Sequence, residues 1–147
     1  MQTCEEFEAI IAHLQALLET GTRWEAKGRD PRTGCDCYGL IAYAYQLQSI
    51  LLPTTAEEAE VFFRCCEPPY KAWDVILCRI HPLYPRHLLL CMGTDWGFHS
   101  AAQTNGLARW SLQQPFWRRM QCQGWRYRLD DTGKSLEAYV LDRDCSL

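Results

Sequence analysis

The fold is decided by Cys35-Asp36-Cys37-Tyr38-Gly39-Leu40, the stretch at which a polar loop gives way to a helix. Residues 21–34, which precede it, are polar and are broken by glycine and proline, a pattern typical of a loop. Apolar residues then recur at helical spacing, namely Leu40, Ile41, Tyr43, Ala44 and Leu47. The pattern predicts a largely buried helix that runs to about residue 49 and has Cys37 in its first turn.

The position of Cys37 suits nucleophilic chemistry. A cysteine acts as a nucleophile in its thiolate form, and a helix N-terminus or a neighbouring imidazole lowers the pKa of a thiol. At the start of the predicted helix, the sulfur of Cys37 would face the free N–H groups of the first turn, whose partial positive charge favours an anion. The same N–H groups are suited to hold an oxyanion during acyl transfer.

Two histidines follow in strand-like segments. His87 opens a predicted strand at residues 87–92, and His99 lies in the next one, at residues 96–101, with a turn at residues 93–95. Two antiparallel strands joined by a short turn would let His99 reach the imidazole of His87 and fix its tautomer. We therefore predict Cys37 as the nucleophile, His87 as its base and His99 as the residue that orients the base.

The rest of the chain predicts helices first and strands afterwards. Thr3 with Glu6, and Thr55 with Glu58, form capping boxes ahead of a first helix that ends near Gly21 and a short helix through residue 63. Strand-like runs follow at residues 74–79, 87–92, 96–101, 107–112 and 124–129, with a sixth at 137–141. This order predicts a single α+β domain over residues 1–147, with N-terminal helices packed on an antiparallel sheet of five to six strands.

The two motifs resemble those of the NlpC/P60 family of papain-like cysteine peptidases. Residues 28–45 resemble the family's nucleophile motif, and residues 87–93 followed by Phe98-His99-Ser100-Ala101 resemble its paired-histidine motif. Residues 74–77 resemble the strand before the histidines. Tyr38 and the closing segment, residues 115–128, resemble versions encoded in phage tail gene clusters. The resemblance covers about residues 21–129, and its specificity lies in the order of one cysteine and two histidines.

The resemblance implies a papain-like fold and hydrolysis of an amide bond in peptidoglycan stem peptides, typically between D-glutamate and a diamino acid. By position, it implies that Trp24, Asp36 and Tyr38 bind the substrate. We expect no cofactor and no metal. Three departures from the family pattern bear on the shape of the groove. Lys27 replaces the first of a usual glycine pair, Ala72-Trp73 replaces a usual Pro-Gly, and Leu89 replaces a usual glycine.

Composition excludes several classes of partner. The net charge of −3 and the lack of a Lys/Arg run argue against a basic surface that binds nucleic acid. No apolar stretch is long enough to insert into a membrane. The first six residues carry acids where a secretory signal would carry Lys or Arg, so we expect synthesis in the cytoplasm without a signal peptide. Together with the resemblance, this predicts that the protein is located at the virion tail tip and acts at the bacterial cell wall. Larger phage tail proteins are the expected partners.

Three alternatives remain open. The first is a catalytically silent domain that serves as a structural or peptidoglycan-binding part of a tail tip. The second is an acyltransferase on the same papain-like fold. The third is a metal-binding module that uses the nine cysteines, although the close pairs Cys35/Cys37 and Cys65/Cys66 lack the usual spacing of tetrahedral zinc sites.

Overall fold

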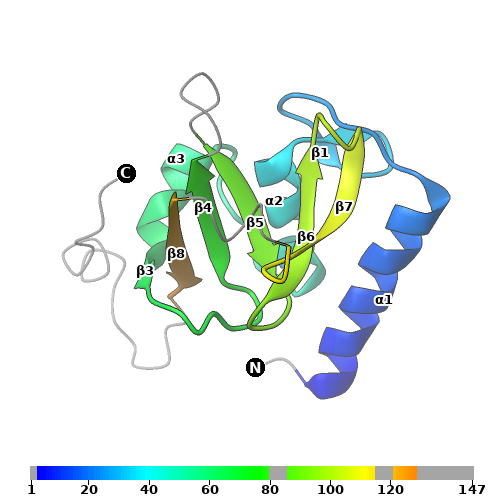
Figure 1. Ribbon diagram of the computed structural model, residues 1–147. Coiled ribbons are helices and arrows are strands. Elements are labelled where there is room, and N and C mark those ends of the chain that lie inside the picture. The colour runs from blue at the N-terminus through cyan, green and yellow to red at the C-terminus, as the bar shows by residue number, and fades with distance from the viewer. Residues whose placement is uncertain (1–2, 80–85, 115–120, 129–147) are drawn as a thin grey trace. The chain divides into compact units, whose positions relative to one another are not determined.

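The computed structural model describes residues 3–79, 86–114 and 121–128 of the chain. Contacts divide the chain into two compact units. Unit 1 comprises Met1–Leu52 and Phe98–Trp110, and unit 2 comprises Pro53–Gly97 and Ser111–Leu147. Figure 1 labels the helices and strands of both units.

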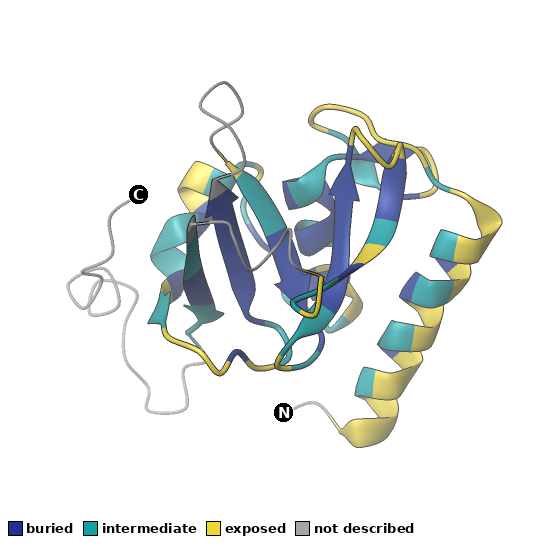
Figure 2. Ribbon diagram, in the orientation of Figure 1, coloured by how far each residue is buried: buried dark blue, intermediate teal, exposed yellow. Residues whose placement is uncertain are grey.

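Unit 1 begins with the predicted amphipathic helix, α1 (Cys4–Thr20). The hydroxyl of Thr3 accepts a hydrogen bond from the Glu6 N–H at 3.1 Å, and the helix ends at Gly21, whose φ of 89° suits glycine. The helix buries one stripe of side chains, Ile10, Leu14 and Leu17. Figure 2 shows this buried stripe beside a long exposed one, so the prediction of an amphipathic first helix is confirmed.

The remaining elements of unit 1 surround the predicted loop-to-helix junction. They are β1 (Arg29–Asp30), β2 (Gly34–Cys35), α2 (Cys37–Leu47), β6 (Trp96–Ala101) and β7 (Gly106–Ser111). Two of these strands extend by a few residues into unit 2. The helix α2 has Cys37 in its first turn, as predicted, and ends two residues before the expected one. The stretch expected to be wholly loop contains the short antiparallel pair β1–β2, which is too brief to leave an alternating pattern in the sequence.

Unit 2 holds a short helix and four strands. They are α3 (Ala56–Ala59) with a 3-10 turn (Glu60–Phe62), β3 (Phe63–Cys66), β4 (Val75–Arg79), β5 (His87–Cys91) and β8 (Gln121–Tyr127). Thr55 caps α3 as predicted, because its hydroxyl accepts a hydrogen bond from the Glu58 N–H at 3.2 Å. Strand β8 lies between β3 and β4, and β5 pairs with the other edge of β4, all antiparallel (Figure 1).

The strands form a six-stranded sheet in the order β3-β8-β4-β5-β6-β7. The α+β class and the six-stranded antiparallel sheet confirm the predicted fold class. The sheet contains one strand beyond the five predicted within the described residues, β3, which lies where the sequence predicts the end of a helix and a loop. The strand predicted at residues 137–141 lies outside the described residues. Within residues 3–79, 86–114 and 121–128, no helix is long and apolar enough to cross a membrane.

A buried ion pair stabilises unit 2 beside β4. Asp74 is 1% exposed, and its two carboxylate oxygens accept hydrogen bonds from the Arg126 guanidinium at 2.9 and 2.8 Å. One of these oxygens also accepts the Lys71 N–H at 2.8 Å. A bidentate, fully hydrogen-bonded pair of this kind compensates the cost of removing both charges from water.

Candidate active site

Asp36 shapes the junction that presents Cys37. One of its carboxylate oxygens accepts the Gly39 N–H at 2.8 Å and caps α2, and the other accepts the Lys27 N–H at 2.8 Å. The Arg29 guanidinium lies 3.7 Å from the capping oxygen. Cys37 is the first residue of α2, in the first turn where the sequence predicted it, and it is partly exposed. The carboxylate of Asp36 therefore positions the loop and helix around Cys37, and its predicted role in binding substrate stays a prediction.

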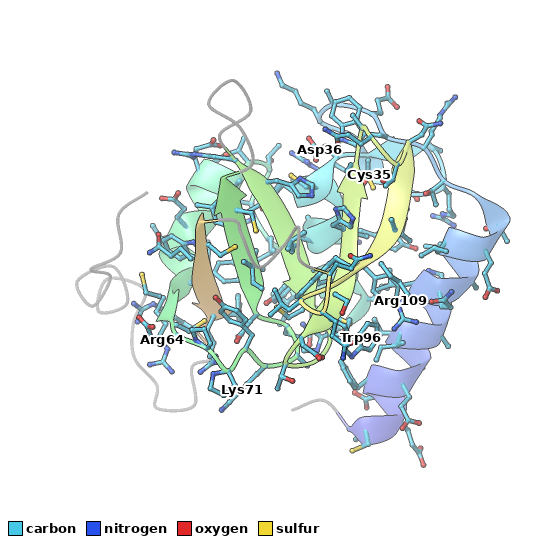
Figure 3. All side chains as sticks on the ribbon, viewed as in Figure 1. Cys35, Asp36, Arg64, Lys71, Trp96 and Arg109 are labelled. Carbon is cyan, nitrogen blue, oxygen red and sulfur yellow. The ribbon has the colours of Figure 1, made fainter. Side chains whose placement is uncertain are left out.

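Cys35 lies beneath this junction and cannot share the role of Cys37. Its side chain is fully buried, and burial raises the pKa of the Cys35 thiol to about 11. Its carbonyl accepts a hydrogen bond from the buried hydroxyl of Ser100 at 2.8 Å, which joins the nucleophile loop to β6. Figure 3 labels Cys35 and Asp36 close together at the entry to α2. Of the two cysteines, Cys37 alone combines exposure with a helix N-terminus.

Gly39 allows the helix to pack tightly on the preceding loop. A Cβ atom at this position would lie 1.9 Å from the carbonyl oxygen of Gly28, a distance that no packing adjustment of side chains relieves because the obstructing atom is backbone. The glycine of the Asp-Cys-Tyr-Gly motif thus has a steric reason, which is the close approach of two backbone segments around Cys37.

Two of the departures from the family pattern occur at residues with positive φ. Lys27, which replaces a usual glycine, has a φ of 64°, and Trp73, which replaces the glycine of a usual Pro-Gly, has a φ of 76°. Non-glycine residues adopt this left-handed region at a cost of about 1 kcal/mol or more. The chain keeps the backbone conformation that glycine would favour, although it has lost the glycine.

Replacing Lys27 with glycine is expected to stabilise the protein. Lys27 is exposed, and the hydrogen bond it makes to Asp36 uses its backbone N–H, so the variant keeps that contact and loses the strain at Cβ. Because glycine also gains entropy in the unfolded chain, we expect a net gain of only about 0.5–1 kcal/mol in the free energy of unfolding. Urea unfolding measures it. Lys27→Ala is the matched control and should give no gain, since alanine keeps the Cβ atom. A destabilised glycine variant would contradict the expectation.

His87 is the first residue of β5, at the predicted strand end, and lies opposite Cys78 of β4. The imidazole is partly buried, and burial lowers the pKa of His87 from 6.5 to about 4. The ring is therefore neutral at pH 7, and a neutral imidazole is the form that accepts a proton from a thiol.

The low pKa of His87 predicts a pH dependence of stability. Between pH 6.5 and 4 the unfolded chain binds a proton at this histidine while the folded chain does not, so the free energy of unfolding falls as the pH is lowered through that range. The expected fall is roughly 2–3 kcal/mol, at about 1.4 kcal/mol per unit of pKa shift. Urea unfolding at a series of pH values measures it. His87→Asn should remove this part of the fall, whereas His13→Gln, on the exposed face of α1, should keep it. Equal slopes for His87→Asn and the unaltered protein would refute the assignment.

His99 lies on β6 and is buried, with 5% of its surface exposed. It belongs to unit 1 together with Cys37, whereas His87 belongs to unit 2. The predicted third residue is thus on a rigid, buried strand, and the Ser100 hydroxyl next to it in the sequence ties that strand to the nucleophile loop.

The side chains predicted to bind substrate flank the junction on unit 1. Trp24 is 36% exposed and forms a β-bridge with Cys35, while Tyr38 is only 7% exposed. The guanidinium of Arg29 lies 5.1 Å from the centre of the Tyr38 ring, a cation–π contact. Arg29 thus contacts both Asp36 and Tyr38, and the sequence analysis missed it because its place in a polar loop marks it as solvated.

Within the residues that the structure describes, no three side chains of His, Cys, Asp or Glu come together in a way that could hold a metal ion.

These features define a class of protein: an α+β fold in which a capped helix presents a partly exposed cysteine, with histidines on strands that follow in the chain. The model of the NlpC/P60 family matches residues 21–126, and the chain belongs to this family. A search of curated proteins finds no match.

Solved structures agree with this assignment at the level of the fold. NlpC2 from Trichomonas vaginalis has a TM-score of 0.66 and 16% identity over 86% of this chain and 48% of its own. A lipoprotein-like NLP/P60 family protein from Staphylococcus aureus has a TM-score of 0.66 and 20% identity over 88% of this chain and 43% of its own. The chain therefore spans less than half the length of each.

The NlpC/p60 domain of the peptidoglycan hydrolase SagA is similar over nearly its whole length. It has a TM-score of 0.60 and 22% identity over 84% of this chain and 98% of its own. The similarity shows that this chain has the fold of that domain.

Proposed function

We propose that this protein is a cysteine peptidase that hydrolyses an amide bond in peptidoglycan stem peptides, with Cys37 as nucleophile, His87 as base and His99 as the residue that orients the base. The observation that carries the proposal is the presentation of Cys37 at the capped N-terminus of α2 in a chain of the NlpC/P60 family. Two peptidoglycan hydrolases, SagA and the RipB protein of Mycobacterium tuberculosis, are similar to this chain in fold. Their activity supports peptidoglycan as the proposed substrate.

In the proposed mechanism, the neutral imidazole of His87 takes the proton of the Cys37 thiol, and the sulfur attacks the amide carbonyl carbon. The free N–H groups of the first turn of α2 stabilise the oxyanion that forms on the carbonyl oxygen. The imidazolium of His87 then donates its proton to the leaving amine as the C–N bond breaks. Water, deprotonated by His87, attacks the acyl-enzyme, which releases the carboxylate product and restores the Cys37 thiol.

The substrate-binding part of the proposal rests on Trp24 and Arg29 of unit 1. Trp24 offers an exposed aromatic face, and Arg29 offers a cation beside Tyr38 and Asp36. Stem peptides carry carboxylates, which an arginine binds through charge-assisted hydrogen bonds. We propose Arg29 as an addition to the predicted set of Trp24, Asp36 and Tyr38.

The test is to incubate the protein, and its Cys37→Ala variant, with intact peptidoglycan and with a defined stem peptide, and to identify the products by mass spectrometry. We expect a free amine and a free carboxylate at one amide bond with the unaltered protein and only a small residual amount of product with the variant. Cys35→Ala is the matched control, since its thiol is buried, and should retain cleavage. Circular dichroism of each variant verifies the fold.

Three outcomes would overturn the proposal in different ways. Cleavage by a folded Cys37→Ala variant at a rate close to that of the unaltered protein would exclude Cys37 as the nucleophile. A product in which the acyl group has moved to another amine or alcohol would identify an acyltransferase. Binding to peptidoglycan with no product from the folded protein would identify a silent binding domain.

We also propose that the protein acts at the bacterial cell wall as part of a phage tail tip, with larger tail proteins as partners. The support for this is the resemblance of Tyr38 and of residues 115–128 to versions from tail gene clusters. Mass spectrometry of purified virions tests it. Recovery of the chain in stoichiometric ratio to tail proteins is the expected result, and its absence from intact particles would refute it.

A further inference from the structure

Two cysteines on neighbouring strands of unit 2 lie in direct contact. Cys78 on β4 and Cys122 on β8 are opposite one another in the antiparallel ladder, and their Sγ atoms are 3.1 Å apart. Both are free thiols. Because a disulfide bond is about 2.0 Å long, the two sulfur atoms need to approach by only about 1 Å to form one.

The backbone already has the spacing that a disulfide requires. Residues directly opposite in antiparallel strands have Cα atoms about 4.5 or 5.5 Å apart, depending on their place in the hydrogen-bonding pattern. Both values lie inside the range of about 4.4–6.8 Å that disulfides span. A bond between Cys78 and Cys122 therefore needs side-chain rotation and no rearrangement of β4 or β8.

The two thiols differ in a way that gives each a role. Cys78 is fully buried, whereas Cys122 is partly exposed. The two sulfur atoms share a hydrogen bond, and this contact lowers the pKa of Cys122 and raises the pKa of the more deeply buried Cys78. Thiolate character combined with access to solvent selects a cysteine for oxidation, so Cys122 is the reactive member and Cys78 the resolving one.

We propose that Cys78 and Cys122 form a peroxide-reactive dithiol that oxidises reversibly to an intramolecular disulfide. The sulfur of Cys122 attacks one oxygen of hydrogen peroxide, which breaks the O–O bond and leaves a sulfenic acid and one water. The sulfur of Cys78 then attacks the sulfenic sulfur and loses its proton, and a second water departs. Two thiols and one peroxide thus give one disulfide and two waters, with the thiols oxidised and the peroxide reduced.

The dithiol lies beside the proposed base. Cys78 is the ladder partner of Cys122 on one side and of His87 on the other. Side chains that are opposite in neighbouring antiparallel strands project from the same face of the sheet, so Cys122, Cys78 and His87 form a row across β8, β4 and β5. Oxidation would therefore change the side chain that neighbours His87.

Peptide mapping tests the proposal, because trypsin separates the two cysteines cleanly. Cleavage after Lys71, Arg79, Arg119 and Arg126 yields peptides 72–79 and 120–126, and each contains one cysteine. The full chain is reduced, freed of reductant, exposed to hydrogen peroxide, and digested without reductant. We expect a disulfide-linked pair of these two peptides in the mass spectrum and recovery of both separate peptides after dithiothreitol.

Two variants make the result specific. Cys122→Ser should abolish the linked pair and leave peptide 72–79 with a free thiol. Cys4→Ser, which removes an exposed cysteine on α1, is the matched control and should leave the linked pair unchanged. The proposal fails if folded protein whose Cys4 has been oxidised shows no linked pair, or if the pair forms only in urea.

Discussion

Replacing His87 with alanine is expected to lower kcat for stem-peptide cleavage by about 10²–10⁴-fold, the usual contribution of a general base. Without the neutral imidazole, the Cys37 thiol lacks an acceptor for its proton and the leaving amine lacks a donor. Residues that act as one unit have strongly non-additive effects. The double variant Cys37→Ala/His87→Ala should therefore be no slower than Cys37→Ala alone, a comparison that steady-state kinetics makes directly.

The double-variant comparison matters because the two residues belong to different units of the chain. If the losses from Cys37→Ala and His87→Ala multiplied, the two side chains would act independently and the proposed pairing would be wrong. His13→Gln controls for the removal of a histidine as such, since His13 is exposed on α1, and should leave kcat unchanged.

Replacing Asp74 with asparagine is expected to reduce the free energy of unfolding by about 3–5 kcal/mol, because it breaks a buried ion pair and leaves the other charge without compensation. Asp74 is 1% exposed and meets Arg126 through two hydrogen bonds. An amide can accept only one of them, and its NH₂ group opposes the donors of the guanidinium. Urea unfolding with a shared m-value measures the loss.

A second ion pair of the same chain supplies the control. Asp30 and Arg32 are 2.8 Å apart, but their side chains are 34% and 65% exposed. Exposed pairs contribute between about 0 and 1 kcal/mol, so Asp30→Asn should change stability little. A loss below about 1 kcal/mol for Asp74→Asn would contradict the assigned role of this pair, because breaking a buried pair costs several times more than breaking an exposed one.

The sequence predicted most accurately the elements whose signals are local. The capping boxes at Thr3 and Thr55 gave the starts of two helices, and Asp36 gave the start of the helix that carries Cys37. Strand β3 was missed because it follows the 3-10 turn without a break and has only four residues. Its place in the sheet comes from pairing with β8, which lies far along the chain. Local pattern carries no information about such a partner.

The candidate site likewise contains features that local sequence predicts and features that only the folded chain creates. The position of Cys37 at a helix start and of His87 at a strand end could be derived from neighbouring residues. The two hydrogen bonds that the Asp36 carboxylate accepts could not be derived in this way, because one of them comes from the N–H of Lys27, nine residues earlier. Arg29 was missed for a similar reason, since its contacts with Asp36 and Tyr38 arise only when the loop folds back on α2.

The left-handed residues Lys27 and Trp73 have a consequence for how distant relatives are found. A comparison of amino-acid sequences scores both positions as mismatches, since the family pattern has glycine at each. A search by dihedral angle scores both as matches, because the φ values of 64° and 76° are those that glycine commonly provides. Comparing backbone torsions should therefore recover divergent members of this family that a glycine-based signature passes over.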